Sequence, residues 1–286
     1  MPECEVCFRH CRLNEGQTGF CGVRSCHDNV IYPDNYGKIT SMALDPIEKK
    51  PLQRFYPGSK ILSIGSYGCN LRCPFCQNHE ISWSKEAYQD TEQIETMAPE
   101  ELLQIALDLQ SRGNIGIAFT YNEPLIAYEY VRDTAILFHE AGLKTVLVSN
   151  GTAESSILHE ILPYIDAMNI DLKGFTDRYY ENILQGNRRQ VMDFISEAVK
   201  GCHVELTTLI IPNENESEEE MREMTEWITG LKDASGNAIG QEIPLHISRF
   251  FPCFHMTDRK ATDVSLVYHL AEVARERLKY VYTGNC

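Results

Sequence analysis

Apolar runs and helical patterns alternate along this chain, and the alternation restricts its fold more than any other feature. Runs rich in β-branched residues predict strands at residues 61–65, 115–121, 145–148, 167–172, 204–211 and 245–250. Apolar residues spaced three and four apart predict helices near residues 99–109, 126–140, 155–162, 191–200, 217–231 and 264–278. About six parallel strands that alternate with helices indicate an α/β fold. Because the strand runs are apolar throughout, we expect both faces of the sheet to be covered.

The ends of the predicted helices carry residues that suit them. Pro99 fits the first turn of a helix, and the acidic pair after it suits the positive end of the helix dipole. Gly113, Gly142 and Gly201 each come just after a predicted helix and just before a predicted strand. We expect these glycines to supply the left-handed caps that end the helices.

Charge and hydropathy narrow the class of protein. The 286 residues include 26 lysines and arginines against 41 aspartates and glutamates, which gives a formal net charge of −15. Such acidity argues against a nucleic-acid surface, which needs clustered basic side chains. No run approaches the roughly 20 apolar residues of a membrane helix, and the first residues lack the pattern of a signal peptide. We therefore expect a cytoplasmic protein with no membrane segment and no nucleic-acid partner.

Eleven cysteines are the most informative part of the composition. In a reducing compartment, so many thiols in a chain of this size indicate metal or redox chemistry rather than disulfides. Cys69, Cys73 and Cys76 follow the pattern C-x3-C-x2-C, and no fourth cysteine lies near them. Three thiolates can hold an iron–sulfur cluster and leave one iron open to a further ligand. A structural zinc completed by His79 is the alternative.

This cysteine loop resembles the cluster loop of the radical S-adenosylmethionine (SAM) superfamily. The resemblance implies that the three cysteines hold a 4Fe-4S cluster, that SAM chelates the fourth iron, and that Phe75 packs near the SAM adenine. It also implies a partial (β/α)6 TIM-like barrel, which we expect over residues 58–286. In barrels of this kind the chemistry lies at the carboxyl ends of the strands.

Polar residues follow the second and third predicted strands. Glu123 is either a carboxylate that meets a cationic ligand group or the N-terminal charge of the next helix. Tyr121, Asn122 and Glu123 occupy the place of the family's Gly-Gly-Glu motif, and the resemblance implies that Glu123 binds the SAM ammonium. Ser149 and Asn150 end the third strand, where they either approach the ribose or carboxylate of SAM or form an ordinary Asn-Gly turn.

Asp171 and Lys173 end the fourth predicted strand, and strand alternation sends both side chains to the same side. The pair resembles the Asp-Leu-Lys of pyruvate formate-lyase activating enzymes, where these residues border the SAM and substrate site. A structural ion pair is the competing interpretation.

Further matches narrow the resemblance to the AmmeMemoRadiSam-system radical SAM proteins, which are related to pyruvate formate-lyase activating enzyme. They are D-P-I-E-K-K-P-L from Asp45, F-Y-P-G-S from Phe55, and Asn78 after the last cluster cysteine, which the resemblance places beside SAM. Those relatives often have a histidine where this chain has Phe251. His255 and Arg249 are the candidates to replace its contact with SAM.

Four more cysteines crowd the beginning of the chain. Cys4, Cys7, Cys11 and Cys21 could close a structural zinc site or hold an auxiliary iron–sulfur cluster, and unligated cysteines are the alternative. We expect residues 1–57 to form a cysteine-rich appendage that contains a hairpin with its turn at residues 36–38.

The resemblance implies an oxidoreductase that receives an electron from a donor such as flavodoxin or ferredoxin. Under anaerobic conditions it would cleave SAM to methionine and a 5′-deoxyadenosyl radical. Within this class, the resemblance favours removal of hydrogen from a protein glycine, as in glycyl-radical activating enzymes. A small molecule or another protein residue is the alternative target, and a non-catalytic metal-binding protein is a remote one.

Overall fold

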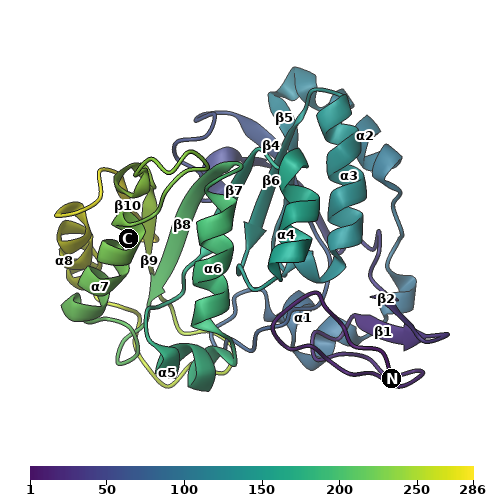
Figure 1. Cartoon of the computed structure of the whole chain (residues 1–286), viewed down its shortest axis with the longest axis horizontal. Helices are drawn as coiled ribbons and strands as arrows, with labels where there is room; N and C mark the ends of the chain where they lie inside the picture. Colours follow the sequence, from purple (N-terminus) through teal and green to yellow (C-terminus); the bar gives the residue numbers. More distant parts are fainter.

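Eight strands form one sheet in a computed structural model that describes all residues 1–286 (Figure 1). From one edge to the other, the order is β10-β9-β8-β7-β6-β5-β4-β3. The strands are β3 (Ser41–Pro46), β4 (Lys60–Gly65), β5 (Asn114–Phe119), β6 (Lys144–Ser149), β7 (Ala167–Asp171), β8 (His203–Ile210), β9 (Leu245–Arg249) and β10 (Val281–Gly284). Strands β4 to β10 are parallel, and β3 is antiparallel to β4. The six predicted strands are confirmed, whereas β3 and β10 were not predicted.

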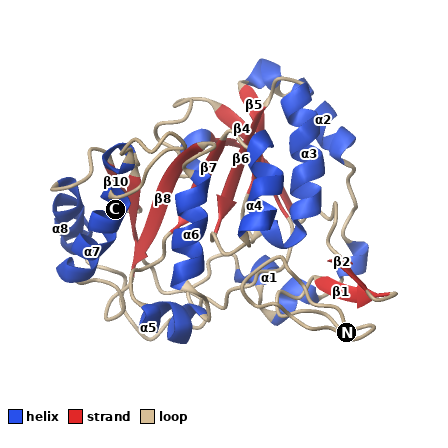
Figure 2. Ribbon diagram, in the orientation of Figure 1, coloured by secondary structure: helices blue, strands red, loops and turns tan.

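The helices lie along the sheet in chain order, and the longer ones cover one face (Figures 1 and 2). They are α1 (His79–Ser82), α2 (Pro99–Asp108), α3 (Tyr128–Glu140), α4 (Ser155–Ile161), α5 (Asp177–Tyr179), α6 (Arg188–Ala198), α7 (Glu218–Thr229) and α8 (Val264–Arg275). Gly113 and Gly142 have the expected positive φ, at 90° and 73°. The expectation for Gly201 is wrong, because its φ is not positive. A glycine is needed there for lack of space, since a Cβ would lie 2.6 Å from the Leu162 side chain. None of the helices combines the length and apolar character that crossing a membrane requires.

Alternate residues of the strands serve two different cores. Leu62 and Ile64 of β4 join the large apolar core that also contains Phe138 of α3. Ile61 belongs instead to a small cluster with Ala118 and with residues of a segment that we call the floor segment, residues 47–57. The members of this second cluster are Ile47, Leu52, Phe55, Ile61, Ala118, Val146 and Ala167. The floor segment therefore packs on the inner face of the sheet, toward the amino ends of the strands.

The part of the chain before β4 differs from expectation. The hairpin predicted around residues 36–38 is wrong, because β1 (Arg24–His27) pairs with β2 (Val30–Pro33) through a turn at Asp28 and Asn29. These two residues have φ of 52° and 60°, and Asp and Asn tolerate that conformation better than most residues do. In addition, β3 is a strand of the sheet and the floor segment packs against the sheet, although both precede residue 58, where we expected the barrel to begin.

The sheet stays open, because its edge strands β3 and β10 do not pair with each other. The α/β fold with parallel strands is confirmed, in the form of an incomplete barrel. Its carboxyl end carries the loops that follow β4, β5, β6 and β7, including α1 and α5 (Figure 1). That end of the sheet contains the candidate site.

Candidate active site

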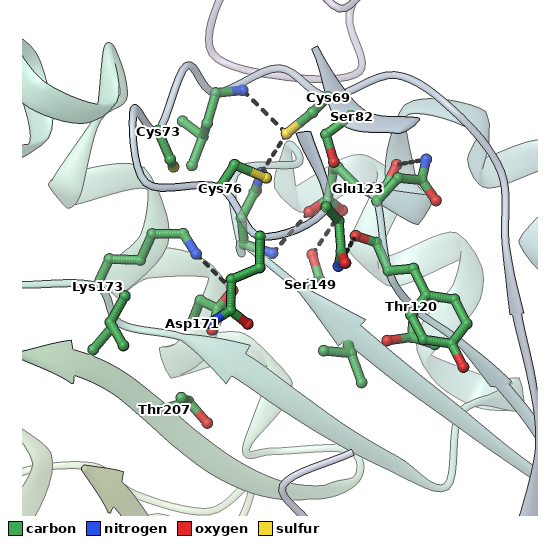
Figure 3. Close-up of a pocket in the computed structure, with 18 of the residues that line it drawn as sticks. Cys69, Cys73, Cys76, Ser82, Thr120, Glu123, Ser149, Asp171, Lys173 and Thr207 are labelled. Carbon is green, nitrogen blue, oxygen red and sulfur yellow. Dashed lines mark hydrogen bonds and ion pairs between the residues drawn. The ribbon is translucent and has the colours of Figure 1, made fainter. Parts of the chain in front are cut away.

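A cavity of about 300 Å³ opens at the carboxyl ends of β4 to β9. All twelve residues that the sequence predicts for the cluster and SAM line it: Cys69, Cys73, Phe75, Cys76, Asn78, Tyr121, Asn122, Glu123, Ser149, Asn150, Asp171 and Lys173. Figure 3 shows the cysteines on one side of the cavity and Glu123, Ser149, Asp171 and Lys173 across from them. Residues from four separate loops therefore converge on one space, although their roles there stay predictions.

The loop that carries the three cysteines is held by hydrogen bonds to its own backbone. Arg72 donates to the carbonyl oxygens of Cys69 and Leu71, both at 2.8 Å, and also to that of Phe20. The indole of Trp83 donates to the carbonyl of Cys73 at 3.2 Å. The cysteines are thus presented by a loop whose backbone is tied on several sides.

Three thiols from one loop are a donor set that suits an iron–sulfur cluster. Burial raises the pKa of Cys69 well above its usual value and that of Cys73 to about 12, so burial alone favours the neutral thiols. Metal binding requires thiolates, and a cation supplies the charge that stabilises them. No three His, Cys, Asp or Glu side chains are close enough to hold one ion. His79, the alternative zinc ligand, stacks on Phe254 and does not line the cavity.

Glu123 is buried, with 3% of its surface exposed, and it has no cationic partner. Its Oε1 accepts hydrogen bonds from Ser149 Oγ at 2.8 Å and Leu125 N at 3.1 Å, and its Oε2 accepts one from Asn150 N at 2.7 Å. Burial raises its pKa to about 7, although these three donors oppose the shift. The bond from Leu125 shows that Glu123 also caps the short helix Pro124–Ala127, as the alternative interpretation required. A carboxylate oxygen accepts more than one hydrogen bond, so Oε2 keeps capacity for a ligand.

The turn after β6 combines both interpretations of its sequence. Asn150 Oδ1 accepts from Thr152 N at 3.1 Å, as in an Asn-Gly turn. Gly151 has φ of 68°, and a Cβ there would lie 2.8 Å from Ile170. Ser149 and Asn150 nevertheless line the cavity, where Asn150 Nδ2 donates to Asn70 Oδ1 at 2.9 Å. The turn therefore fixes two polar side chains against the cysteine loop.

Asp171 and Lys173 form the ion pair that the competing interpretation required, with Nζ 2.7 Å from Oδ2. Both also line the cavity. Burial opposes the charge of Lys173, but the neighbouring Asp171 carboxylate outweighs it and raises the pKa of the lysine. An ammonium has three donors, and Asp171 accepts from one of them. Lys173 can therefore present a cation to an anionic ligand group.

Asn78, Tyr121 and Asn122 link the end of β5 to the cysteine loop. Asn78 Nδ2 donates to the carbonyl of Tyr121 at 2.7 Å. Asn122 Nδ2 donates to the carbonyls of Tyr67 and Gly68, both at 3.1 Å. The amide group of Asn122 is thus committed to the backbone just before Cys69, and its position in the cavity wall follows from that.

The structure adds cavity residues that we did not single out from the sequence. They are Leu71, Gln77, Ser82, Thr120, Val148, Thr207, Leu209, Ser248 and Asn285. Thr207 and Ser248 could have been predicted from the sequence. Alternate residues of a strand face the same side of the sheet, and each of these two is a polar residue near the end of its strand, β8 or β9. Neither Arg249 nor His255 lines the cavity: Arg249 donates to Thr262 O at 2.7 Å, and Phe251 is exposed.

The amino-terminal cysteines lie behind the cluster loop, outside the cavity. Cys4, Cys7 and Cys21 are buried, and Cys11 is half-buried. Burial raises the pKa of Cys7 to about 11. The carbonyl of Cys21 accepts a hydrogen bond from Cys69 N at 3.3 Å, so this segment contacts the cluster loop directly. As at the cluster loop, no three of these side chains are at single-ion distance.

Comparison with known proteins agrees with this geometry. The sequence pattern of the Radical SAM superfamily matches residues 63–227. The uncharacterized protein MJ0808 of Methanocaldococcus jannaschii is 38% identical over 99% of this chain and 80% of its own length. MJ1632 of the same organism, whose name assigns it provisionally to the glycyl-radical enzyme activating enzymes, is 24% identical over 53% of this chain and 56% of its own.

Among solved structures, Streptococcus suis SuiB bound to S-adenosylmethionine superposes with a TM-score of 0.58 at 14% identity. The match covers 79% of this chain and 52% of SuiB, so this chain spans about half the length of that protein. At this identity the likeness concerns the fold alone.

Proposed function

The chain belongs to the radical SAM superfamily, and from this premise we propose that it reductively cleaves SAM in the cavity at the carboxyl end of its sheet. One observation carries the proposal: three thiols of one loop and a buried carboxylate without a cation face the same space. The first set suits an iron–sulfur cluster, and the second suits the ammonium of SAM.

Cys69, Cys73 and Cys76 would hold the 4Fe-4S cluster that the family uses, and the donor set fits it. When bound, that cluster supplies one electron to the SAM sulfonium, which gives methionine and a 5′-deoxyadenosyl radical. The loop's own contribution is geometric. Its backbone hydrogen bonds to Arg72 and Trp83 restrain the loop that carries the thiols.

Glu123 and Lys173 would orient SAM by two of its three charged groups. The free acceptor capacity of Glu123 Oε2 suits the SAM ammonium, and a cation there would lower the raised pKa of this carboxyl. The remaining donors of the Lys173 ammonium suit an anionic group, and Asp171 holds that ammonium in place. Ser149 and Asn150 lie between these two residues and would approach the ribose or the carboxylate of SAM.

For the substrate, we propose a glycine of a protein partner, as in glycyl-radical activation. The name of MJ1632 supports this choice. The open sheet supports it as well, since its edges β3 and β10 leave a side through which a peptide could approach. A cavity of about 300 Å³ is at the small end for a drug-sized ligand, so a target beyond SAM itself would extend outside it. An electron donor such as flavodoxin or ferredoxin completes the reaction.

A small molecule or another protein residue is the second candidate target, and the polar far wall of the cavity favours it. Thr207, Ser248 and Asn285 line that wall, away from Glu123, and could bind a polar substrate.

We also propose that the chain is one of the AmmeMemoRadiSam-system radical SAM proteins. A second metal at Cys4, Cys7, Cys11 and Cys21, either zinc or an auxiliary cluster, is also a proposal, which the spacing of these cysteines supports, although no three of their side chains lie at single-ion distance.

The test is iron and zinc analysis of protein purified without oxygen, compared with the Cys73→Ala and Cys202→Ala variants. Wild type and Cys202→Ala should contain about four irons for the cluster loop, and Cys73→Ala should lose them. Cys202 is a matched control because it is a half-buried thiol outside both cysteine groups. Zinc without iron in wild type would contradict the proposal and favour a non-catalytic metal-binding protein.

A further inference from the structure

Tyr121 has a backbone conformation that few residues with a large side chain adopt. Its φ is 73°, in the left-handed region that favours glycine. It lies two residues before Glu123 and contributes to the cavity wall. Strained residues persist only where their surroundings hold them. The contacts of the Tyr121 side chain show what holds this one.

The Tyr121 side chain is anchored by a buried ion pair. Asp45 Oδ2 accepts a hydrogen bond from Tyr121 Oη at 2.7 Å and another from Lys50 Nζ at 2.9 Å. Lys50 belongs to the floor segment, and only 2% of its surface is exposed. Its Nζ also lies 4.6 Å from the centroid of the Tyr121 ring, within the range of a cation–π interaction.

The ring has room only because β4 ends in a glycine. A Cβ at Gly65 would lie 2.8 Å from Tyr121 Cδ2 and 3.0 Å from its Cβ. The tyrosine therefore runs over the end of β4 to reach Asp45 of β3. This path connects the floor segment to the cavity wall.

The backbone of Tyr121 passes this restraint on to the site. Its carbonyl accepts the hydrogen bond from Asn78, the residue two places after Cys76. On the other side, Asn122 binds the backbone that leads into Cys69, and Glu123 follows it. A change in the φ of Tyr121 would therefore move the Glu123 carboxylate and the Asn78 amide together.

We propose that Asp45 and Lys50 are positioning residues for SAM, which act through Tyr121 by holding its backbone in the left-handed conformation and so fixing Asn122 and Glu123, which follow it. The inference rests on the proposed function, because that function assigns SAM to this wall. It gives a role to D-P-I-E-K-K-P-L, a segment that the chemistry of the cavity does not otherwise use. A glycine at position 121 would need no such anchor, since glycine adopts positive φ freely.

The test measures the dissociation constant of SAM by equilibrium dialysis on anaerobically reconstituted protein. Tyr121→Phe removes only the hydroxyl, and we expect it to weaken SAM binding about tenfold. We expect the same effect from Asp45→Asn. In a Tyr121→Gly background, Asp45→Asn should have no further effect on that constant. Tyr36→Phe is the matched control, because Tyr36 Oη makes the same bond to Asp133 Oδ2 at 2.7 Å on an exposed surface.

A readout without SAM separates this inference from the proposed function. Hydrogen exchange at the amides of residues 121–123 should be faster in Tyr121→Phe than in wild type, with no change in Tyr36→Phe. If Asp45→Asn does not fold because Lys50 loses its partner, Tyr121→Phe decides alone, since it leaves the ion pair intact.

Two results would overturn the inference: wild-type affinity and exchange in Tyr121→Phe, or an equal loss from Asp45→Asn in the glycine background. If wild type neither holds iron nor binds SAM, the proposed function fails and the SAM part of the inference fails with it. Faster exchange in Tyr121→Phe would then still support the anchor itself.

Discussion

Two glutamates are buried at opposite ends of the same sheet, and their surroundings differ. Glu123, after β5 at the carboxyl end, receives two backbone N–H groups and one hydroxyl and has no cation; burial raises its pKa to about 7. Glu205 lies in β8 near the amino end. Despite its burial, hydrogen bonds from His203, His246 and the floor segment lower its pKa to about 2.

Both carboxylate oxygens of Glu205 already have hydrogen-bond partners within the protein. His246 Nε2 lies 2.6 Å from one carboxylate oxygen, and His203 Nε2 lies 3.0 Å from the other. The backbone N–H groups of Gln53 and Arg54 donate at 3.0 Å and 2.7 Å. These bonds fasten the floor segment beneath the sheet, so the charge of Glu205 stabilises the fold.

The difference distinguishes a carboxylate that could still bind a cation from one whose partners all belong to the protein. Both are buried, and burial of a charge is unfavourable unless partners compensate for it. At Glu205 the protein supplies that compensation, whereas at Glu123 the compensation is incomplete and a cationic ligand would complete it. Parallel α/β barrels place chemistry at the carboxyl end and stability at the amino end, and the role that we propose for Glu123 and the contacts of Glu205 are consistent with that division.

The largest expected effect is on stability, from Glu205→Gln. Loss of the charge leaves two histidines and two amides facing a neutral group, and we expect the free energy of unfolding to fall by about 3 kcal/mol. Urea unfolding monitored by circular dichroism measures it. The SAM affinity of the folded variant should remain within about twofold of wild type. A tenfold loss would show that Glu205 also contributes to SAM binding.

The reciprocal variant, Glu123→Gln, should act on binding. Removal of a charged acceptor for the SAM ammonium should raise the dissociation constant about 30-fold, equivalent to about 2 kcal/mol. Equilibrium dialysis gives the constant, and the unfolding midpoint should change far less than in Glu205→Gln. A variant that binds SAM normally but unfolds early would show Glu123 to be only a helix cap.

The lowered pKa of Glu205 also predicts a pH dependence of stability. Because the pKa of Glu205 is about 2 in the fold and 4.5 ordinarily, its stabilising contribution is complete above pH 4.5 and is lost as the pH falls toward 2. Unfolding experiments between pH 6 and pH 3 should show a steeper loss of stability in wild type than in Glu205→Gln. Parallel curves for the two proteins would contradict the assignment.

The smallest effect is expected from His203→Gln. His203 is partly exposed, with 31% of its side chain accessible, whereas His246 is 8% accessible. We expect a loss of about 1 kcal/mol from the free energy of unfolding, because solvent screens the partly exposed pair. His246→Gln should cost more, and the reverse order would show that His203 carries the interaction.

Much of the site was predictable because chemistry at strand ends leaves local patterns. The spacing of Cys69, Cys73 and Cys76 is local, and Glu123 and Asp171 each follow an apolar run. The alternation of β7 placed Asp171 and Lys173 on one side, and they form an ion pair in the cavity wall. The strands themselves were predictable where they were long and apolar.

The rest depended on contacts between distant segments. β3 includes Asp45 and ends in Pro46, and β10 has only four residues, so neither has the long apolar run that predicts a strand. The charge of Glu205 inside an apolar run was visible in the sequence, but apart from His203 its partners lie 41, 151 and 152 residues away. The anchor of Tyr121 joins residues 76 positions apart and could not be inferred from spacing.

The proposed function requires that SAM be cleaved in the cavity at the carboxyl end of the sheet. The most direct measurement is the yield of 5′-deoxyadenosine when anaerobically reconstituted protein is reduced in the presence of SAM. We expect product from wild type and Cys202→Ala, strongly reduced product from Glu123→Gln at limiting SAM, and none from Cys73→Ala. No product from wild type, or equal product from Cys73→Ala, would contradict it.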